Sequence, residues 1–265
     1  KPLLLRSPLL AIAALIVAAT TGGVVVHVAG LPPPAVGTVG EDGPAADAAL
    51  NNAEDVAVAP NGDIYIADYN SARLLRISDG ILTVAYRGDP SADENDFSGV
   101  AVAADGTVYF TTGEAVMSMS PEGTIAEVAA EEAGSQVYGP KLSVAPDGAL
   151  IVGGGRLPRL DRIEADGTTT LLAGSDEVAT EPGVGDGGPA SSARFGRISD
   201  LAIDSSGAIF VADEVFGDVR RIGPDGVVST VFGGGTIPFP EAVDGDAAAD
   251  IDYGSAEIGV AVDSA

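Results

Sequence analysis

The feature that most constrains the fold of this chain is an internal repeat of about 40 to 45 residues. Its marker is a turn glycine between two short apolar segments, and the markers are Gly62, Gly106, Gly148 and Gly207. Successive markers lie 44, 42 and 59 residues apart, so the last step carries an insertion. A second turn glycine follows each marker after 17 to 19 residues, at Gly80, Gly123, Gly167 and Gly226. A repeat of this length predicts an array of similar supersecondary units.

Each repeat has the pattern of four short strands. In the first repeat, Val56 and Val58 and then Ile64 and Ile66 alternate with small or polar residues, as in strands with one buried face. Asn-Gly or Asp-Gly between the first two strands is typical of a tight turn, because glycine adopts positive φ without strain. A third strand (LLRI, DRI, VRRI) and a fourth (ILTVA, TIAEVA, TTTLLA, VVSTVF) follow. Four antiparallel strands per repeat predict an all-β fold, a β-propeller of about five to six blades.

The composition fits a folded, strongly acidic chain. Of 265 residues, 46% are hydrophobic and 36 are glycine, which is enough for a core and many turns. The absence of cysteine excludes disulfides and thiolate zinc sites. A formal charge of −26 argues against binding to nucleic acid or to anionic lipid headgroups. This acidity favours surface solubility, and a high-salt habitat or many Ca²⁺ contacts are the alternatives.

The N-terminal residues 1–30 differ from the repeats. After Lys1 and Arg6, residues 8–26 form an uncharged apolar run of 19 residues, long enough for one transmembrane helix. The basic flank predicts a cytoplasmic N-terminus and repeats outside the cytoplasm, at the cell membrane. An uncleaved or cleavable signal peptide is an alternative, and a buried core helix is a weaker one. The proline-rich residues 31–37 are expected to form a stiff linker.

Two long segments resemble bacterial NHL repeats with a GDGGPA lead-in. They are VGEDGPAADAALNNAEDVAVAPNGDIYIADYNSARLLRI (39–77) and VGDGGPASSARFGRISDLAIDSSGAIFVADEVFGDVRRIGPDGVVSTVFGGG (184–235), and a third lead-in begins at Val243. The resemblance implies an NHL-type propeller over residues 38–265. It also implies Asp, Asn and Arg after the second strand, a pattern that Asp68, Asn70 and Arg73 match. The fourth copy retains only Asp213, and the middle copies have Thr112 and Gly153 at the Asp position.

The strand ends supply the candidate binding residues. Asp68 with the adjacent Tyr69, and Asp213 in the fourth copy, could face a shared channel, although an Asx turn that satisfies backbone donors is the more common role. Arg73 could instead bridge neighbouring blades. The one basic cluster contains Arg156, Arg159 and Arg162 and could dock an acidic ligand, with ion pairs between blades as the alternative.

The two ends of the repeat region indicate how the ring closes. Residues 34–40 (PAVGTVG) match a fourth strand with no preceding three strands, and residues 259–265 (GVAVDSA) match a first strand and the start of its turn. In propellers such a lone strand joins the last blade, which removes two exposed edges. We expect both segments to belong to one further blade, whose remaining strands follow Ala265. The resemblance implies six blades in complete members of the family.

The catalytic chemistry available to the repeats is narrow. The single histidine is His27, which excludes a Ser/His/Asp set or a histidine-ligated metal in the repeat region. A Ca²⁺ site needs only oxygen ligands and stays open, with weak candidates in one loop, Asp89, Asp93, Glu94 and Asp96. Their spacing does not match an EF-hand, and a solvated acidic loop is the simpler interpretation. The glycine-rich residues 185–190 lack the Lys-Ser/Thr of a phosphate-binding loop.

These observations favour a membrane-tethered, extracytoplasmic propeller without catalytic activity. Its expected ligand is a protein or a small molecule that binds the blade-connecting loops. The resemblance admits the sensor domain of a receptor, such as a Ser/Thr kinase, or a separate adhesion module. The alternative from another class is a Ca²⁺-dependent, lactonase-like hydrolase, which requires carboxylates that converge on the central channel.

Overall fold

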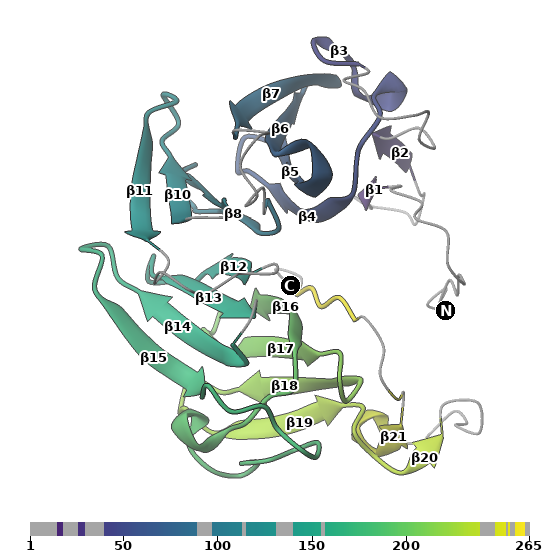
Figure 1. The fold of residues 1–265 in the computed structure, drawn as a ribbon, viewed down its shortest axis with the longest axis vertical. Helices are drawn as coiled ribbons and strands as arrows, with labels where there is room; N and C mark the ends of the chain where they lie inside the picture. The colour runs from purple at the N-terminus through teal and green to yellow at the C-terminus, as the bar shows by residue number, and fades with distance from the viewer. Residues whose placement is uncertain are drawn as a thin grey trace.

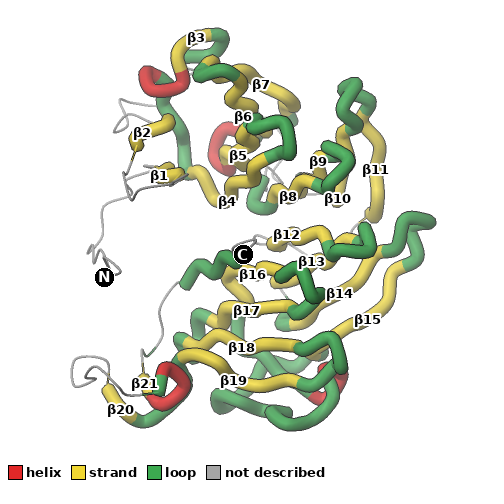
Figure 2. The backbone as a smooth tube through the Cα atoms, turned by 180° about the vertical axis from the view of Figure 1, so that it is seen from behind, coloured by secondary structure: helices red, strands yellow, loops and turns green. Residues whose placement is uncertain are grey.

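The computed structural model describes most of the repeat region and two short N-terminal stretches. The described residues are 15–17, 26–29, 40–88, 97–112, 115–130, 140–154, 157–238, 247–252, 254 and 258–262. Four antiparallel sheets within these residues are arranged around a common centre, as Figure 1 shows from one side and Figure 2 from the other. The prediction of an all-β propeller with four-stranded antiparallel blades is confirmed, and four blades are described.

The first two blades follow the predicted strand order. Blade 1 contains β4 (Ala53–Val58), β5 (Ile64–Asp68), β6 (Arg73–Ser78) and β7 (Ile81–Arg87), with the short β3 (Gly43–Pro44) outside β7. Blade 2 contains β8 (Val100–Val102), β9 (Val108–Thr111), β10 (Ala115–Met119) and β11 (Ile125–Ala130). In both blades the strand that comes first in the sequence lies nearest the centre (Figure 1).

The other two blades have the same order. Blade 3 contains β12 (Pro140–Val144), β13 (Leu150–Gly154), β14 (Arg159–Ile163) and β15 (Thr169–Gly174). Blade 4 contains β16 (Ile198–Ile203), β17 (Ile209–Asp213), β18 (Asp218–Ile222) and β19 (Val228–Phe232). A short parallel pair follows, β20 (Ile237–Pro238) and β21 (Ile251–Asp252). The short 3₁₀ turns are η1 (Ala45–Asp47), η2 (Tyr69–Ser71), η3 (Ala190–Ser192) and η5 (Ala248–Asp250).

The four marker glycines make the tight turn between the first two strands of each blade. Their φ angles lie between 86° and 91°, at Gly62, Gly106, Gly148 and Gly207. A side chain is strained at these angles, so glycine is the residue that the turn requires. The period of the sequence therefore reflects a tight turn with positive φ that recurs once in each blade.

The core lies between neighbouring blades. Between blades 1 and 2, the ring of Phe97 stacks on Phe110 with centroids 6.2 Å apart, and Tyr86 lies 5.0 Å from Phe110. Between blades 3 and 4, Phe195 is fully buried in a cluster that includes Leu160 of β14 and Val211 of β17. Blades 1 to 3 thus each bury one face of the sheet against the next blade, and this packing holds the described blades together.

Residues 258–262 lie at the centre of the ring beside blade 4. The amide of Val260 donates to Asp200 Oδ2 at 2.8 Å, just as the amide of Val100 in β8 donates to Asp55 Oδ2 at 2.9 Å. The hydroxyl of Ser199 also donates to the carbonyl of Ile258. The segment predicted as the first strand of a further blade therefore occupies the position of a first strand, although no strand pairing is assigned to it.

The N-terminal segment differs from the expected helix wherever the structure describes it. Leu15–Val17 forms strand β1, which pairs antiparallel with β2 (Val26–Ala29). Three of the seven residues are valine and one is isoleucine, and β-branched residues favour strands over helices. Among the described residues, no helix is both long and apolar enough to span a bilayer. The rest of residues 8–26, the linker 31–37 and residues 34–39 of the expected closing strand lie outside the described part.

Truncation of Phe97 to alanine tests the packing between blades 1 and 2. Phe97 is 1% exposed, so we expect Phe97→Ala to lower the free energy of unfolding by about 3–5 kcal/mol. Leu171→Ala is the control, because Leu171 is 54% exposed and its loss should cost less than about 0.5 kcal/mol. Urea denaturation followed by circular dichroism measures both. A loss below about 1 kcal/mol for Phe97→Ala contradicts the assignment.

Candidate functional site

Asp68 and Arg73, two of the predicted binding residues, form a buried ion-pair network in blade 1. Asp68, at the end of β5, is fully buried and accepts the amide of Asn51 at 2.6 Å and the guanidinium of Arg73. Arg73 is 3% exposed and also donates to Glu41 at 2.6 Å. Arg87 donates to Glu41 from the outer strand β7. These contacts join the lead-in to three strands of one blade, so Arg73 connects parts of blade 1 and does not bridge blades.

The charge state of Glu41 fits this structural role. Partial burial raises the pKa of Glu41, but the hydrogen bonds from Arg87 and Arg73 outweigh it and hold the pKa below its usual value. Tyr69, also predicted as a binding residue, opens η2 and is half-buried, and its amide donates to the carbonyl of Asn52. The structure brings the three predicted residues of blade 1 together, but Asp68 and Arg73 hold the strand end closed.

Blades 2 and 3 close the same strand end without aspartate. In blade 2, the hydroxyl of Thr112 at the aspartate position accepts the amide of Ala115 at 3.2 Å, and the hydroxyl of the neighbouring Thr111, which is 1% exposed, accepts the amides of Ser98 and Gly99. In blade 3, a Cβ atom on Gly153 would lie 2.2 Å from a methyl carbon of Leu160, so any side chain would clash there. The residues that replace the family's aspartate therefore follow from local packing.

Blade 4 repeats the network of blade 1 with one charge reversed. Each residue lies 145 positions after its counterpart, so Asp213 matches Asp68, Asp186 matches Glu41, and Asp218 stands where blade 1 has Arg73. Asp213 accepts the amides of Gly196, Arg197 and Val215. The guanidinium for Asp186 comes from Arg220, which is 1% exposed and also donates to two backbone carbonyls.

Among the described residues, the carboxylate of Asp218 has no hydrogen-bond partner. It is 1% exposed, and neither carboxylate oxygen has a donor within reach. Burial, and then the negative charge of Asp213, raise the pKa of Asp218 to about 7, although Arg220 acts in the opposite direction. The side chain is therefore close to half protonated at neutral pH. The buried carboxylate lowers the stability of the fold, and it is not accessible to a ligand.

The remaining predicted site residues fall into two groups. Arg159 pairs with Asp161 and Asp176, and Arg162 pairs with Asp147 and Glu164. These partners all belong to repeat 3, so the ion pairs lie within a blade and not between blades. Arg156 and the weak metal candidates Asp89, Asp93, Glu94 and Asp96 lie outside the described residues. Within the described part, no group of three or more acidic or histidine side chains is arranged to hold a metal ion.

A second set of charged side chains, which the sequence reasoning missed, lies at the hub where the first strands meet. These hub residues are Asp55, Lys141 and Asp200, each seven positions before a marker glycine, and blade 2 has Gly99 there. Asp55 Oδ2 accepts the amide of Val100 in the next blade. Lys141 Nζ donates to the carbonyls of Glu54 at 3.0 Å and Ser98 at 3.1 Å. A comparison of the four repeats at this fixed offset could have found the set.

Burial favours the protonated form of the two hub carboxylates, Asp55 and Asp200. Burial raises the pKa of Asp55 to about 6, against the charge of Lys141 and the hydrogen bond from Val100, which lower it. Burial likewise raises the pKa of Asp200. Both side chains are half-buried, and their oxygens already accept backbone amides of their own strand and of the neighbouring segment. The hub residues therefore connect one blade to the next by hydrogen bonds.

Comparisons with known proteins support the fold. Residues 50–77 match the family model of the NHL repeat. No curated protein matches the chain. The NHL match covers β5 and β6, so the Asp68–Arg73 pair lies inside the matched repeat, whereas Glu41 and Arg87 lie outside it.

Several solved structures have a similar arrangement of strands. One is an auxiliary nutrient binding protein from Bacteroides ovatus, 18% identical, with 71% of this chain and 48% of that chain covered and a TM-score of 0.56. Another is a protein of unknown function from Bacteroides thetaiotaomicron, 17% identical, with 86% and 68% covered and a TM-score of 0.53. A nidogen/laminin complex is 17% identical, with 68% and 64% covered and a TM-score of 0.51. Identities this low show the propeller fold alone, and this chain spans about half to two thirds of the length of these structures.

Substitution of Asp218 by asparagine tests the unpaired carboxylate. The folded pKa of about 7 lies above the unfolded value, so wild-type stability falls as the pH rises from about 4 to 7, and the whole penalty is present above pH 7. Asparagine cannot ionise. We expect Asp218→Asn to match the wild type near pH 4 and to be more stable by about 2–4 kcal/mol at pH 8.

Asp213→Asn is the matched control for this measurement. Asp213 accepts three backbone amides, so we expect its loss to destabilise the protein at both pH values, by about 1–3 kcal/mol. Thermal and urea unfolding at pH 4, 6 and 8 compare the three proteins. An Asp218→Asn variant with no gain at pH 8 means that the carboxylate has a partner in solution.

Proposed function

We propose that the propeller is a recognition module without catalytic activity, which binds a protein or small-molecule ligand through the loops that connect its strands and blades. The observation that carries this proposal is a pair of exposed valines in the loops of blade 4, Val178 and Val215. They are 59% and 41% exposed. Single exposed apolar residues are common, but two in adjoining loops that are held by buried contacts suit recognition.

The contacts around these valines place them on adjoining loops. Ala179, next to Val178, donates its amide to the carbonyl of Phe195 at 2.7 Å. A Cβ atom on Gly196 would lie 2.6 Å from Val215 Cβ, so the backbone at Gly196 runs directly beside Val215. The two loops therefore meet on either side of the short segment Phe195–Gly196. We refer to the surface of Val178 and Val215 as the valine surface.

The loops that carry the valine surface are fixed in place. Asp213 accepts the amide of Gly196 on one side and of Val215 on the other. Phe195 is fully buried in the core between blades 3 and 4. A surface that is ordered before binding loses little conformational entropy when a partner binds, which favours affinity. Arg197 and Glu214 form an ion pair beside it and supply a polar rim.

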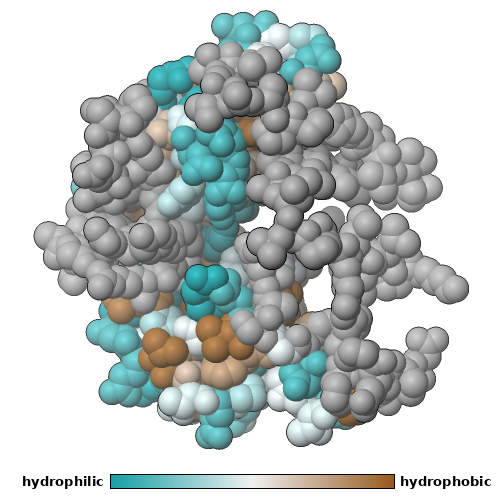
Figure 3. Space-filling view, turned by 45° about the vertical axis from the view of Figure 1, so that its right-hand side comes forward, coloured by the Kyte–Doolittle hydropathy of each residue, from teal (hydrophilic) through white to brown (hydrophobic). Residues whose placement is uncertain are grey.

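The space-filling view agrees with an uneven distribution of polarity. Figure 3 shows hydrophilic residues along the upper part of the described surface and hydrophobic residues gathered in its lower half. Two of the similar structures are described as a nutrient binding protein and as a complex between two proteins. The same fold is thus found in proteins with binding descriptions, which is consistent with the proposal for this chain.

Replacement of both valines by serine tests the valine surface. Peptides selected from a random displayed library against the wild-type chain are measured by biolayer interferometry against the variant Val178→Ser/Val215→Ser. We expect affinity to fall at least tenfold, and the melting temperature to change by less than about 2 °C because both side chains are exposed. Val58→Ser and Leu171→Ser, at sites 56% and 54% exposed, are the controls. Selected peptides that bind the double variant as tightly as the wild type overturn the assignment.

A Ca²⁺-dependent hydrolase is the competing proposal, and the half-buried hub carboxylates Asp55 and Asp200 are the observation in its favour. Both have a raised pKa, as a general acid requires. However, each already accepts two backbone amides. We expect no hydrolysis of aliphatic or sugar lactones with 5 mM CaCl₂ or with EDTA. Turnover that requires Ca²⁺ and falls in Asp55→Asn would replace the binding proposal by the enzymatic one.

We further propose that residues 8–26 tether the propeller to the cell membrane, with the blades outside the cytoplasm, as in a receptor sensor. This requires residues 8–26 to form a helix in the bilayer in place of the β1–β2 pair. The support is the uncharged run of 19 residues that follows Lys1 and Arg6. In cells that express the chain with a C-terminal tag, the tag should sediment with membranes after carbonate extraction. It should also be cut by protease added to spheroplasts. Release of the tagged protein by carbonate contradicts the tether.

A further inference from the structure

The structure contains a cavity between blades 3 and 4 that lies apart from the valine surface. It has a volume of about 450 Å³ and opens on the face that carries the tight turns of the blades, around Gly207 and Gly226. The blade-connecting loops lie at the opposite strand ends. We call this cavity the interblade pocket. Its volume falls within the range of ordinary small-molecule sites.

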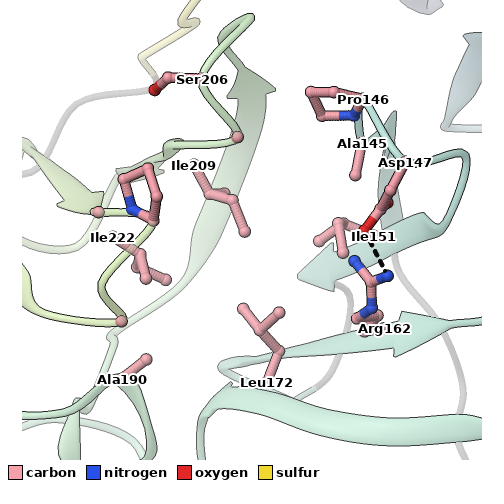
Figure 4. A pocket seen from close by; sticks show the side chains of 14 residues that line it. Ala145, Pro146, Asp147, Ile151, Arg162, Leu172, Ala190, Ser206, Ile209 and Ile222 are labelled. Carbon is pink, nitrogen blue, oxygen red and sulfur yellow. Dashed lines mark hydrogen bonds and ion pairs between the residues drawn. The ribbon is translucent and has the colours of Figure 1, made fainter.

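The lining of the interblade pocket is mostly aliphatic. In Figure 4, Leu172 and Ile151 of blade 3 and Ile209 and Ile222 of blade 4 extend toward the same space from opposite sides. Arg162 and Asp147 form an ion pair at one side of it, with 2.8 Å between Nη2 and Oδ2. The pocket therefore combines an apolar interior with charged groups at one edge, the combination that binds amphiphilic small molecules.

The corresponding space between blades 1 and 2 is smaller, and one residue accounts for much of the difference. That space has a volume of about 250 Å³ and is lined by Tyr65. Tyr65 pairs with Arg76 across β5 and β6, as Ile151 pairs with Arg162 across β13 and β14. The two residues are therefore equivalent. The phenol ring of Tyr65 is 8% exposed and occupies room that the isoleucine leaves free in blade 3.

The charges at the edge of the pocket favour a cation. Arg162 is held by two carboxylates, through Nε to Glu164 at 2.6 Å and through Nη2 to Asp147. Its hydrogen bonds to these carboxylates raise the pKa of Arg162, and the one to Asp147 lowers the pKa of Asp147. Glu164 is not part of the pocket lining, but with it the ion-pair group at this edge carries one net negative formal charge. Asp147 is 61% exposed at its side chain and can also contact a ligand.

We propose that the interblade pocket binds a small apolar molecule with one positive charge, such as a primary amine with an aliphatic chain. The chain of the ligand lies among Ile151, Leu172, Ile209 and Ile222, and its ammonium group lies near Asp147. An anionic ligand of the same size is disfavoured, because Arg162 is already paired and the whole chain carries a charge of −26. The site is separate from the valine surface and does not depend on it.

Three ligands with the same chain and different head groups test the proposal. Isothermal titration at pH 7 and low ionic strength compares n-octylamine, 1-octanol and sodium octanoate, each below its critical micelle concentration. We expect octylamine to bind at least tenfold more tightly than octanoate, with octanol between them. We also expect octylamine to raise the melting temperature, since a detergent effect would lower it. Equal affinity for the three ligands, or no binding of octylamine, overturns the proposal.

Variants locate the binding and separate its two components. Ile151→Tyr installs the residue that blade 1 has at this position, and we expect it to abolish octylamine binding, whereas Ile151→Val retains it. Asp147→Asn is at an exposed site and leaves the pocket open, so it should fold even if Ile151→Tyr does not. We expect Asp147→Asn to weaken octylamine binding about fivefold to tenfold and to leave octanol binding unchanged. Octylamine binding that both variants retain in full places the ligand elsewhere and refutes the assignment.

Discussion

The inner edges of the ring depend on hub side chains that bond to the backbone of neighbouring segments and so supplement the packing between blades. The first strand of each blade pairs on one side only, so the amides on its other edge face the centre and lack strand partners. Asp55 accepts such an amide from Val100, and Asp200 accepts the one from Val260. Lys141 satisfies carbonyls from two other blades in the same way. Without these contacts the blades would pack face to face, but the inner strand edges would be open to non-native pairing.

The comparison of blades 1 and 4 shows how one network can be rebuilt with different residues. Blade 1 neutralises Asp68 and Glu41 with Arg73. In blade 4 the cation moves two positions along the strand, to Arg220, and the vacated position is an aspartate. Arg220 takes over the contact to Asp186, whereas Asp213 is satisfied by backbone amides alone. The fold tolerates this exchange because Asp186 and Asp213 still find donors, whereas the carboxylate of Asp218 has none among the described residues.

Much of the fold was predictable, because the repeat is encoded in residues whose backbone conformation is restricted. The marker glycines have positive φ, and of the alternating apolar residues of repeat 1, Ile66 is fully buried and Val56 partly buried, whereas Val58 is exposed. The N-terminal prediction failed at Leu15–Val17 because hydropathy alone does not separate a helix from a strand of β-branched residues. From the sequence, an aspartate at the end of the second strand can be interpreted as a turn residue or as a binding residue. In the structure, Asp68 is buried in a local network.

The hub and the interblade pocket were beyond the sequence for two different reasons. The hub residues share a position but not a chemistry, since that position is Asp, Gly, Lys and Asp in the four blades. A search for a common residue type misses such a set, and only the register of the repeats reveals it. The pocket depends on side chains that meet from different blades, and on the difference between Tyr65 and Ile151, neither of which has a pattern along the chain.

The insertion between blades 3 and 4 connects the two faces on which we place binding. It runs over residues 175–197, and Ala179 and Phe195 hold its two ends together beside the valine surface. Between them, Ala190 donates its amide to the carbonyl of Gly226, and both residues line the interblade pocket. Blade 1 has an equivalent lead-in at Gly43–Pro44 and η1. The insertion that breaks the regular period therefore contributes to both proposed binding surfaces. It carries Val178 of the valine surface and Ala190 of the interblade pocket.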